Sequence, residues 1–258
     1  MFKLDEKVIL ITGGASGIGK SSARLLGESG AKLAICDINK EEGNKVIEEL
    51  EEKGIEAKYF NCDVSNPESV QKTVSQVIDF WGKIDVAFLN AGIEGPADKL
   101  QDISYTDWKK TFSVNVDGIF LAAKFILPLM EEENSGNIII TSSNLGMSTL
   151  PGKAAYSATK AAIIMLAKSI AVDYKDSDIR ANVVCPGPVK TPLVTNRWEE
   201  IDDPVEREKV KNAILNIPQL MEVEEVAKTV LFLASDASKA YNGETFVIDN
   251  GARAELAE

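Results

Sequence analysis

The sequence predicts an α/β fold in which a doubly wound, seven-stranded parallel sheet carries helices on both faces. Apolar, β-branched runs of strand length recur along the chain, and the longer segments between them repeat apolar residues with the period of a helix. Alternating strands and helices are typical of parallel sheets, because each helix returns the chain to the same end of the sheet. A chain of 258 residues, 45% of them hydrophobic, can bury a large core.

The expected strands cover residues 8–12, 32–36, 57–62, 84–89, 137–142, 179–184 and 245–248. The expected helices cover residues 18–29, 40–53, 67–81, 106–132, 154–175 and 223–235. No linker, repeat or low-complexity block divides the chain, so residues 1–258 are expected to form one domain. The alternation stops at residues 187–218, where Pro192, Pro204 and Pro218 bracket an acidic stretch. A connection this long predicts a loop over the substrate or a poorly ordered segment.

Composition excludes several classes of function. A net charge of -12 with scattered basic residues disfavours nucleic acid and anionic membranes as partners. No apolar stretch reaches the roughly 20 residues of a membrane span, and the N-terminus has no signal-peptide core. The three widely spaced cysteines indicate core thiols without disulfides. We therefore expect a cytoplasmic protein with a small-molecule partner.

The chain contains no histidine. This excludes Ser-His-Asp hydrolysis, histidine metal sites and histidine acid/base chemistry. The cysteine spacing offers no metal cluster either, so we expect no metal. Proton transfer in an enzyme of this composition must rest on Tyr, Lys or carboxylates.

A glycine-rich turn joins the first expected strand to a helix. Glycines permit close backbone approach and the amides of a helix N-terminus attract phosphate, so the turn predicts a pyrophosphate site. Its spacing is Gly-x-x-x-Gly-x-Gly rather than the commoner Gly-x-Gly-x-x-Gly, and an ordinary loop is the alternative. The turn residues expected at the cofactor are Gly13, Ser16, Gly17, Ile18 and Gly19.

Asp37 ends the second strand of the same βαβ unit. A carboxylate there can accept both hydroxyls of an adenosine ribose. A 2'-phosphate would face its negative charge, and neither Ser16 nor Ile38 supplies an offsetting arginine, which favours NAD over NADP. The alternative is a turn residue that begins the next helix. The next two strands also end in small or polar residues, which are individually weak signals: Asp63, Val64, Asn90, Ala91 and Gly92.

Tyr156 and Lys160 form a Tyr-x-x-x-Lys pair on one face of an expected helix. A nearby ammonium lowers the pKa of a phenol, which makes the pair a usable acid/base. Tyr105 and Lys109 have the same spacing. Tyr156 follows an apolar strand and opens a long, alanine-rich helix, whereas Tyr105 lies among polar residues that start a helix. The context therefore predicts a surface position for Tyr105.

In combination, these segments resemble the short-chain dehydrogenase/reductase family, in the branch with one Rossmann-type domain of about this length. The resemblance runs from Lys7 to about Gly251 and is carried by Thr12, Gly13, Gly17, Gly19, Asn90, Ala91, Gly92, Asn115, Ser143, Tyr156, Lys160, Pro186 and Gly187. It implies NAD(H)-dependent hydride transfer between a secondary alcohol and a ketone. It also implies a homotetramer that pairs helices 106–132 and 154–175 and uses the last helix and strand for a second contact.

The resemblance assigns roles to the catalytic residues. Tyr156 exchanges a proton with the substrate oxygen and also contacts the cofactor. Lys160 binds the nicotinamide ribose and lowers the pKa of the tyrosine. Ser143 orients the substrate oxygen, with Ser142 as its structural neighbour, and Asn115 holds a water that links the lysine to solvent. Contacts to the nicotinamide end are implied for Pro186, Gly187, Val189 and Thr191, for which a plain proline-rich turn is the alternative.

The sequence does not identify the substrate. Candidate pocket positions mix acidic, apolar and aromatic character: Glu94, Asn144, Leu145, Met147, Leu193 and Trp198. They are compatible with a sugar, polyol, steroid, cyclic diol or 3-oxoacyl compound. A different class of function is a nicotinamide-binding regulatory protein that has lost catalysis, which the intact catalytic set disfavours. A hydrolase or isomerase on the same fold is a third alternative. The sequence disfavours it, because it contains no histidine and no recognisable nucleophile elbow.

Overall fold

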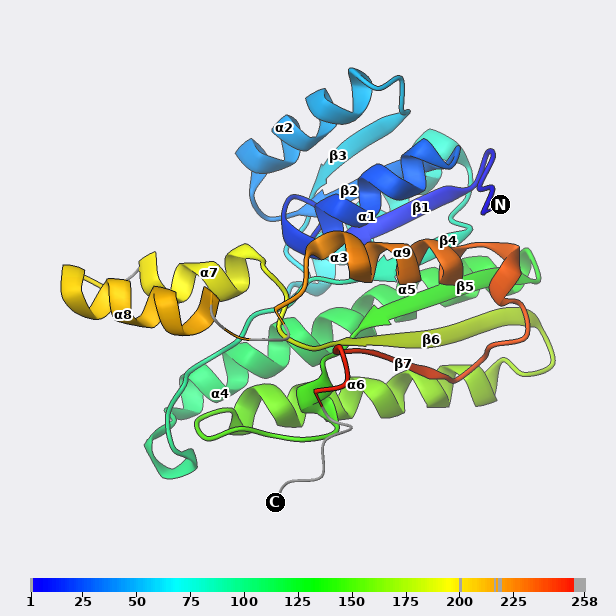
Figure 1. Cartoon of the computed structure of the whole chain (residues 1–258). Helices are drawn as coiled ribbons and strands as arrows, with labels where there is room; N and C mark the ends of the chain where they lie inside the picture. Colours follow the sequence, from blue (N-terminus) through cyan, green and yellow to red (C-terminus); the bar gives the residue numbers. More distant parts are fainter. Residues whose placement is uncertain (1, 200, 216, 218–219, 253–258) are drawn as a thin grey trace.

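The computed structural model describes residues 2–199, 201–215, 217 and 220–252. Within these residues, seven parallel strands form one sheet in the order β3-β2-β1-β4-β5-β6-β7 (Figure 1). The strands are β1 (Val8–Thr12), β2 (Lys32–Asp37), β3 (Ala57–Asn61), β4 (Val86–Leu89), β5 (Ser135–Thr141), β6 (Asp178–Pro186) and β7 (Thr245–Ile248). The strand order reverses direction between β1 and β4, which confirms the predicted doubly wound fold.

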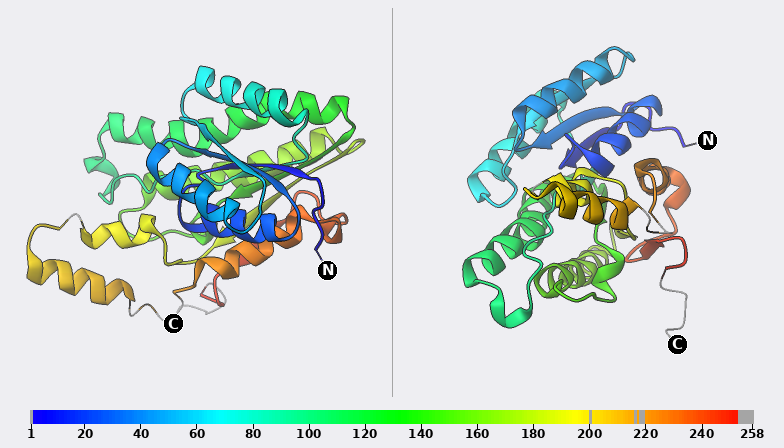
Figure 2. Two further views of the ribbon diagram at one scale, coloured as in Figure 1. Left: turned by 90° about the horizontal axis from the view of Figure 1, so that it is seen from above. Right: turned by 60° about the vertical axis from the view of Figure 1, so that its left-hand side comes forward.

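Helices cover both faces of the sheet (Figure 2). One face carries α1 (Gly17–Glu28), α2 (Lys40–Glu51) and α9 (Val223–Ala234), and the other carries α3 (Pro67–Trp81), α5 (Gly118–Glu132) and α6 (Ala154–Asp173). Alternate residues of β1 point into the two resulting cores: Leu10 packs with the α3, α5 and α6 side, and Ile11 with the α1, α2 and α9 side. Strands buried on both faces explain why the sequence shows continuous apolar runs.

Two helical stretches, Tyr105–Glu132 and Ala154–Asp173, are long and apolar enough to cross a membrane by length and composition. In this fold, however, they supply much of one core layer. Ile126 and Met130 of the first stretch and Ile163 and Ala167 of the second are buried among the residues of the sheet. Their apolar character therefore follows from packing against strands, as in the core helices of an α/β domain.

The helix expected at 106–132 differs from the prediction. It is divided into α4 (Tyr105–Phe112), a π-helical turn (Ser113–Asp117) and α5. The apolar period continues through the turn, so periodicity does not reveal the extra residue that a π-turn inserts. Such turns are frequent at functional sites, and this one contains Asn115.

The connection expected as a loop at 187–218 contains two helices, α7 (Pro192–Glu199) and α8 (Pro204–Leu215). Pro192 and Pro204, which suggested a break in structure, occupy the first positions of these helices, where proline is favoured because its missing N–H would have no helical partner. Asp203 supports the second helix start, since its carboxylate accepts hydrogen bonds from the backbone of Val205 and Glu206. Pro218 lies outside the described residues.

Candidate active site

The carboxyl ends of the strands surround a cavity of about 390 Å³. Eighteen of the residues predicted at the site line it: Gly13, Ser16, Gly17, Ile18, Asn90, Ala91, Gly92, Glu94, Ser143, Asn144, Leu145, Tyr156, Lys160, Pro186, Gly187, Val189, Thr191 and Leu193. They come from the turns after β1, β4, β5 and β6, from the last residue of β6 and from the helices α1, α6 and α7. The fold thus gathers distant segments at the edge where parallel α/β sheets bind ligands.

The glycine-rich turn between β1 and α1 has the geometry of a phosphate site. Gly13 and Gly17 have φ angles of +65° and +50°, in the left-handed region that favours glycine. Ser16 is the N-cap of α1, but its side chain makes no capping hydrogen bond. By contrast, Asn39 and Asn66 cap α2 and α3 with their side chains. The first-turn amides of α1 are therefore available to an anion.

Asp37 is connected to this turn. One oxygen of its carboxylate accepts a hydrogen bond from the Ala15 backbone N–H at 3.0 Å, and the other accepts from the Asn39 N–H at 2.9 Å. Each oxygen keeps a further acceptor position. Asp37 can thus hold the turn and still accept hydrogen bonds from hydroxyl groups of a ligand.

Asn90 links the ends of three strands. Thr12 Oγ1 accepts hydrogen bonds from the backbone N–H groups of Asn90 and Ala91 at 3.0 and 3.2 Å. The Asn90 side chain donates to the Gly13 carbonyl at 3.2 Å and accepts from the Thr141 hydroxyl at 3.1 Å. These bonds fix the floor of the cavity across β1, β4 and β5.

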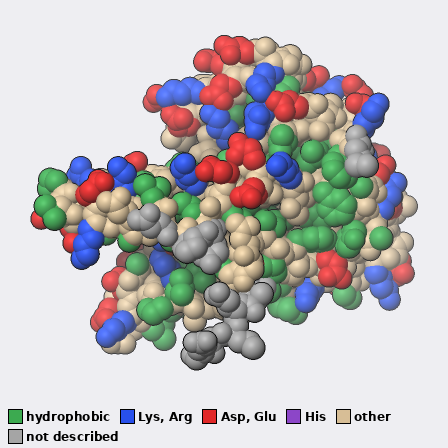
Figure 3. Space-filling model, in the orientation of Figure 1, with side chains coloured by type: hydrophobic (Ala, Val, Ile, Leu, Met, Phe, Trp, Pro, Cys, Tyr) green, Lys and Arg blue, Asp and Glu red, His purple; other side chains and the backbone are tan. Residues whose placement is uncertain are grey.

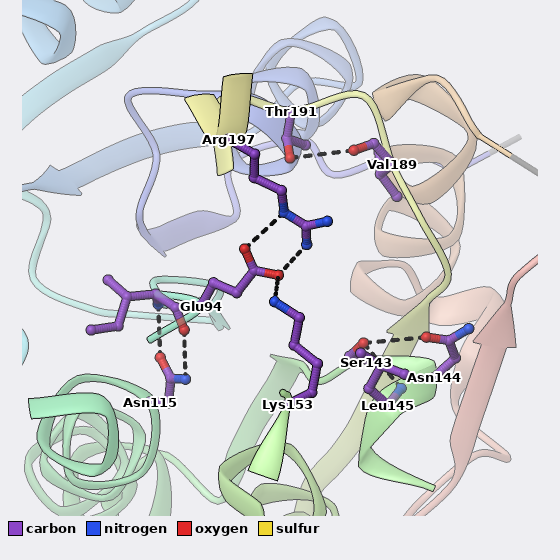
Figure 4. Close-up of polar contacts among 10 residues, drawn as sticks. Glu94, Asn115, Ser143, Asn144, Leu145, Lys153, Val189, Thr191 and Arg197 are labelled. Carbon is purple, nitrogen blue, oxygen red and sulfur yellow. Dashed lines mark hydrogen bonds and ion pairs between the residues drawn. The ribbon is translucent and has the colours of Figure 1, made fainter. Parts of the chain in front are cut away.

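Tyr156 lies in the first turn of α6 and borders the cavity. Burial raises the pKa of its phenol to about 12, while a hydrogen bond with the Ser143 hydroxyl acts in the opposite direction. Ser143 also accepts a hydrogen bond from the Leu145 backbone N–H at 3.1 Å, which orients its hydroxyl (Figure 4). The phenol is therefore protonated and uncharged at neutral pH, and it lies beside the serine hydroxyl.

Lys160 is almost fully buried, with 3% of its surface exposed. Burial lowers the pKa of its ammonium group to about 8. Its Nζ donates to the Thr141 carbonyl at 2.9 Å and lies 5.6 Å from the centre of the Tyr156 ring. A Cβ at Gly92 would come within 3.4 Å of this Nζ and 3.2 Å of Asn115 Oδ1. The absence of a side chain at Gly92 thus lets the lysine and the asparagine approach the cavity.

Asn115 does not line the cavity but supports its wall from the π-helical turn. Its side chain accepts from the Ile93 N–H and donates to the Ile93 carbonyl, both at 2.8 Å (Figure 4), and donates to the Thr159 hydroxyl at 3.1 Å. Thr159 in turn donates to the Tyr156 carbonyl at 2.7 Å. Oδ1 keeps one acceptor position beyond these bonds, which is where the predicted water would bind.

The segment after β6 closes the cavity on the side of the glycine-rich turn. The Gly187 N–H donates to the Ile248 carbonyl at 2.8 Å. Thr191 lies against the turn, since a Cβ at Gly17 would come within 3.1 Å of its methyl carbon. The Thr191 hydroxyl points toward the Val189 carbonyl at 3.4 Å (Figure 4).

Seven predicted site residues do not line the cavity: Gly19, Asp37, Asp63, Val64, Asn115, Met147 and Trp198. Asp63 forms a turn with the backbone and hydroxyl of Ser65 at 2.9 and 2.6 Å, and Val64 packs against Gly118. Trp198 does not line the cavity, although Val194, one helical turn earlier in α7, does. The prediction of Trp198 as a pocket residue stays a prediction.

Sequence reasoning missed a charged cluster formed by Glu94, Lys153 and Arg197 (Figure 4). Glu94 was predicted at the pocket, but its two cationic partners were not. They come from the start of α6 and from α7, and no local motif connects them. The other lining residues outside the predicted set include apolar side chains from three separate segments, Leu150, Val194 and Ile217, and residues near predicted ones, Thr141, Ser142, Pro188 and Pro192.

Comparison with known proteins identifies the family of this chain. The family model described as enoyl-(acyl carrier protein) reductase matches residues 13–253. Secoisolariciresinol dehydrogenase of Forsythia intermedia is 38% identical over 96% of this chain and 90% of its own. The crystal structure of levodione reductase superposes with a TM-score of 0.93 at 31% identity, over 98% and 100% of the two chains. NAD+-bound xylitol dehydrogenase gives a TM-score of 0.89 at 32% identity, over 96% and 100%. The chain is therefore an oxidoreductase that belongs to the short-chain dehydrogenase/reductase family.

Proposed function

We propose that this protein interconverts a secondary alcohol and a ketone with NAD(H), and that Tyr156 is the acid/base of the reaction. The observation that carries the proposal is the convergence of Ser143, Tyr156 and buried Lys160 on one cavity whose opposite wall is the glycine-rich turn. This arrangement pairs a proton-transferring group with a site for a dinucleotide phosphate.

The residues of the turn fit a nicotinamide dinucleotide. The uncapped amides of α1 suit its pyrophosphate, and Gly13 and Gly17 leave room for its backbone contacts. The free acceptor positions of Asp37 suit the ribose hydroxyls, while its negative charge disfavours a 2'-phosphate. A cofactor with an unphosphorylated ribose, NAD, is therefore the proposed partner, as it is in the xylitol dehydrogenase structure.

The proposed mechanism divides the chemistry between these residues. A bound nicotinamide supplies the hydride donor or acceptor. For ketone reduction, Tyr156 Oη holds a proton and gives it to the carbonyl oxygen, and for alcohol oxidation the phenolate takes the hydroxyl proton. Ser143 Oγ orients the substrate oxygen beside the phenol. Lys160 supplies a positive charge that favours the phenolate, and its pKa of about 8 keeps most of it protonated at neutral pH.

Titration with NADH and NADPH, followed by fluorescence, tests the cofactor part of the proposal. We expect NADH to bind at least tenfold more tightly, and an Asp37→Asn variant to narrow this difference. A screen of secondary alcohols and ketones with NAD(H) tests the reaction. Binding without turnover across a broad panel would favour the regulatory alternative, and no binding of either cofactor would refute the proposal.

We also propose that the protein is a homotetramer. Apolar side chains gather beside α9 and β7 (Figure 3), where Tyr241 lies 5.7 Å from Phe232 and 5.4 Å from Phe246 between ring centres. Phe120 of α5 and Met165 of α6 are exposed on the outer helical layer. Both surfaces coincide with the contacts that the family resemblance implies. Size-exclusion chromatography with light scattering would contradict this proposal if it gave a monomer.

A further inference from the structure

Helix α7 covers the cavity but is weakly embedded in the protein. It contributes Leu193, Val194 and Arg197 to the cavity lining. None of its residues, all of which are described, is fully buried. A helix with so little buried surface requires specific contacts to stay in place.

Glu94 provides such a contact from the turn after β4. Its Oε2 accepts a hydrogen bond from Arg197 Nε at 2.9 Å, and its Oε1 accepts from Arg197 Nη2, which makes the pair bidentate (Figure 4). Oε1 also accepts from Lys153 Nζ at 2.7 Å. Lys153 is the N-cap residue of α6. Glu94 therefore connects the covering helix to the start of the helix that carries Tyr156.

The degree of burial distinguishes this cluster from ordinary surface ion pairs. The side chains of Glu94 and Lys153 are 15% and 11% exposed, and that of Arg197 is 38% exposed. Exposed pairs contribute little because water and salt screen them. The α8 pair Lys209–Glu206, with exposures of 75% and 54%, is an example in the same segment. Screening is much weaker at Glu94.

The cluster also determines part of the charge around Tyr156. The carboxylate of Glu94 raises the pKa of the Tyr156 phenol, and the guanidinium of Arg197 lowers it. The other groups that face the phenol are Ser143, the Cys185 thiol from β6 and the Lys160 ammonium from α6. None of these three groups belongs to α7, so they stay beside the phenol whether or not α7 contacts Glu94. The charge of Arg197 is the contribution that departs with α7.

We propose that Glu94 and Arg197 are positioning residues: their ion pair holds α7 over the cavity and balances the charge beside Tyr156. The charge of Arg197 opposes that of Glu94 beside the phenol only while α7 lies over the cavity. The position of α7 and the acidity of the Tyr156 phenol are therefore coupled. The role in proton transfer rests on the proposed function, whereas the anchoring of α7 does not.

Tyrosine NMR measures the charge balance without any substrate. The chain has five tyrosines, and with ring-labelled tyrosine the signal of Tyr156 is assigned by its loss in Tyr156→Phe. We expect its ionisation to move to higher pH in Arg197→Met by roughly half a unit to one unit, and to lower pH in Glu94→Gln by less, because release of α7 there also removes the charge of Arg197. Arg197→Lys keeps the charge and should titrate close to wild type. The Lys209→Met control should not shift.

The opposite signs separate this proposal from a purely structural role. Glu94→Gln and Arg197→Met break the same ion pair, so a general loosening of the site would move both titrations in one direction. Equal shifts of the same sign, or no shift in either variant, would overturn the charge-balance part. Retained turnover in Tyr156→Phe would instead refute the proposed function and leave the titration result intact.

Limited proteolysis measures the anchoring of α7. We expect cleavage within residues 192–215 to accelerate several-fold in Glu94→Gln and Arg197→Met. The acceleration should be smaller in Arg197→Lys, which retains an ion pair but loses the bidentate geometry. Lys209→Met should be cleaved like wild type. Cleavage at the wild-type rate in both Glu94→Gln and Arg197→Met would overturn the anchoring part.

Discussion

Two Tyr-x-x-x-Lys pairs in this chain have similar internal geometry and different surroundings. Lys109 Nζ lies 5.1 Å from the ring centre of Tyr105, and Lys160 Nζ lies 5.6 Å from that of Tyr156. Tyr105 is 74% exposed at the start of α4, whereas Lys160 is 3% exposed beneath the cavity. Helical spacing thus explains why the two side chains of each pair lie close together. It does not explain the acid/base chemistry proposed for Tyr156 and Lys160.

The difference between the pairs lies in what the tertiary structure adds. At Tyr105, Ser104 caps the helix by accepting a hydrogen bond from the Asp107 N–H at 3.0 Å, and the pair faces solvent. At Tyr156, burial removes water from both members and changes the pKa of each. A cation that water does not screen acts on its neighbour far more strongly. The two pairs thus share their spacing and differ in burial, and the proposed acid/base role belongs to the buried pair.

Removal of the hydroxyl should separate the two tyrosines most clearly. We predict that Tyr156→Phe lowers turnover by about 10²–10⁴-fold, the usual contribution of a general acid or base. NADH affinity should stay near wild type, because the contacts proposed for the pyrophosphate and the adenosine ribose do not involve the phenol. Tyr105→Phe should leave turnover unchanged. Steady-state kinetics with NAD(H) and fluorescence titration provide the two measurements, and substantial activity in Tyr156→Phe would contradict the assignment.

Replacement of the lysines should reveal their burial through the pH dependence of stability. Between about pH 8 and 10.5, the folded protein binds fewer protons at Lys160 than the unfolded chain does. The stability of the wild type relative to Lys160→Met should therefore rise with pH across this interval, by about 3 kcal/mol in total. Urea unfolding of both proteins at the two ends of the interval measures the change.

Lys109→Met is the matched control for this experiment. It should change the free energy of unfolding by no more than about 0.5 kcal/mol, as is usual at exposed positions. Lys160→Met also loses the hydrogen bond to the Thr141 carbonyl, which changes its free energy of unfolding by a similar amount at each pH. The pH dependence is consequently the decisive quantity. If the difference in free energy of unfolding between wild type and Lys160→Met were the same at both pH values, burial would not lower the pKa of Lys160.

The fold could be predicted almost entirely, because periodicity reports how each segment meets the sheet. Strands 8–12 and 245–248 and helix 67–81 have the predicted bounds. The errors arise where one signal has two physical meanings. Pro192 and Pro204 favour a helix start as well as a loop, and the π-helical turn around Asn115 preserves the apolar pattern of its helix.

The candidate site could be predicted where its residues belong to compact motifs. The glycine-rich turn, Asn90 and the Tyr156–Lys160 pair each follow a strand or open a helix, and the fold brings them to the same edge. Lys153 and Arg197 could not be found in this way. Their relation to Glu94 exists only after three separate segments have folded together, so no spacing in the sequence encodes it.

Two serines test whether the neighbours of the buried pair share its function. We predict that Ser143→Ala lowers turnover by roughly 10–100-fold, because the substrate oxygen and the phenol lose an oriented hydrogen-bonding partner. Ser142→Ala removes the bond from its hydroxyl to the Lys160 carbonyl at 2.8 Å and should mainly reduce stability. Ser104→Ala, beside the exposed pair, should leave turnover unchanged. Equal kinetic effects of Ser143→Ala and Ser142→Ala would contradict the distinction.

The smallest expected effect concerns a threonine on the helix of each pair, Thr159 on α6 and Thr106 on α4. Thr159 is fully buried and connects Asn115 to the Tyr156 carbonyl. Thr159→Val keeps the shape but leaves an Asn115 N–H without an acceptor, so it should reduce the free energy of unfolding by about 1–2 kcal/mol. Thr106→Val, an exposed change on α4, should stay within about 0.5 kcal/mol. If urea unfolding gave equal values for the two variants, the hydrogen bonds behind Tyr156 would not stabilise its helix, and the buried pair would owe its position to apolar packing alone.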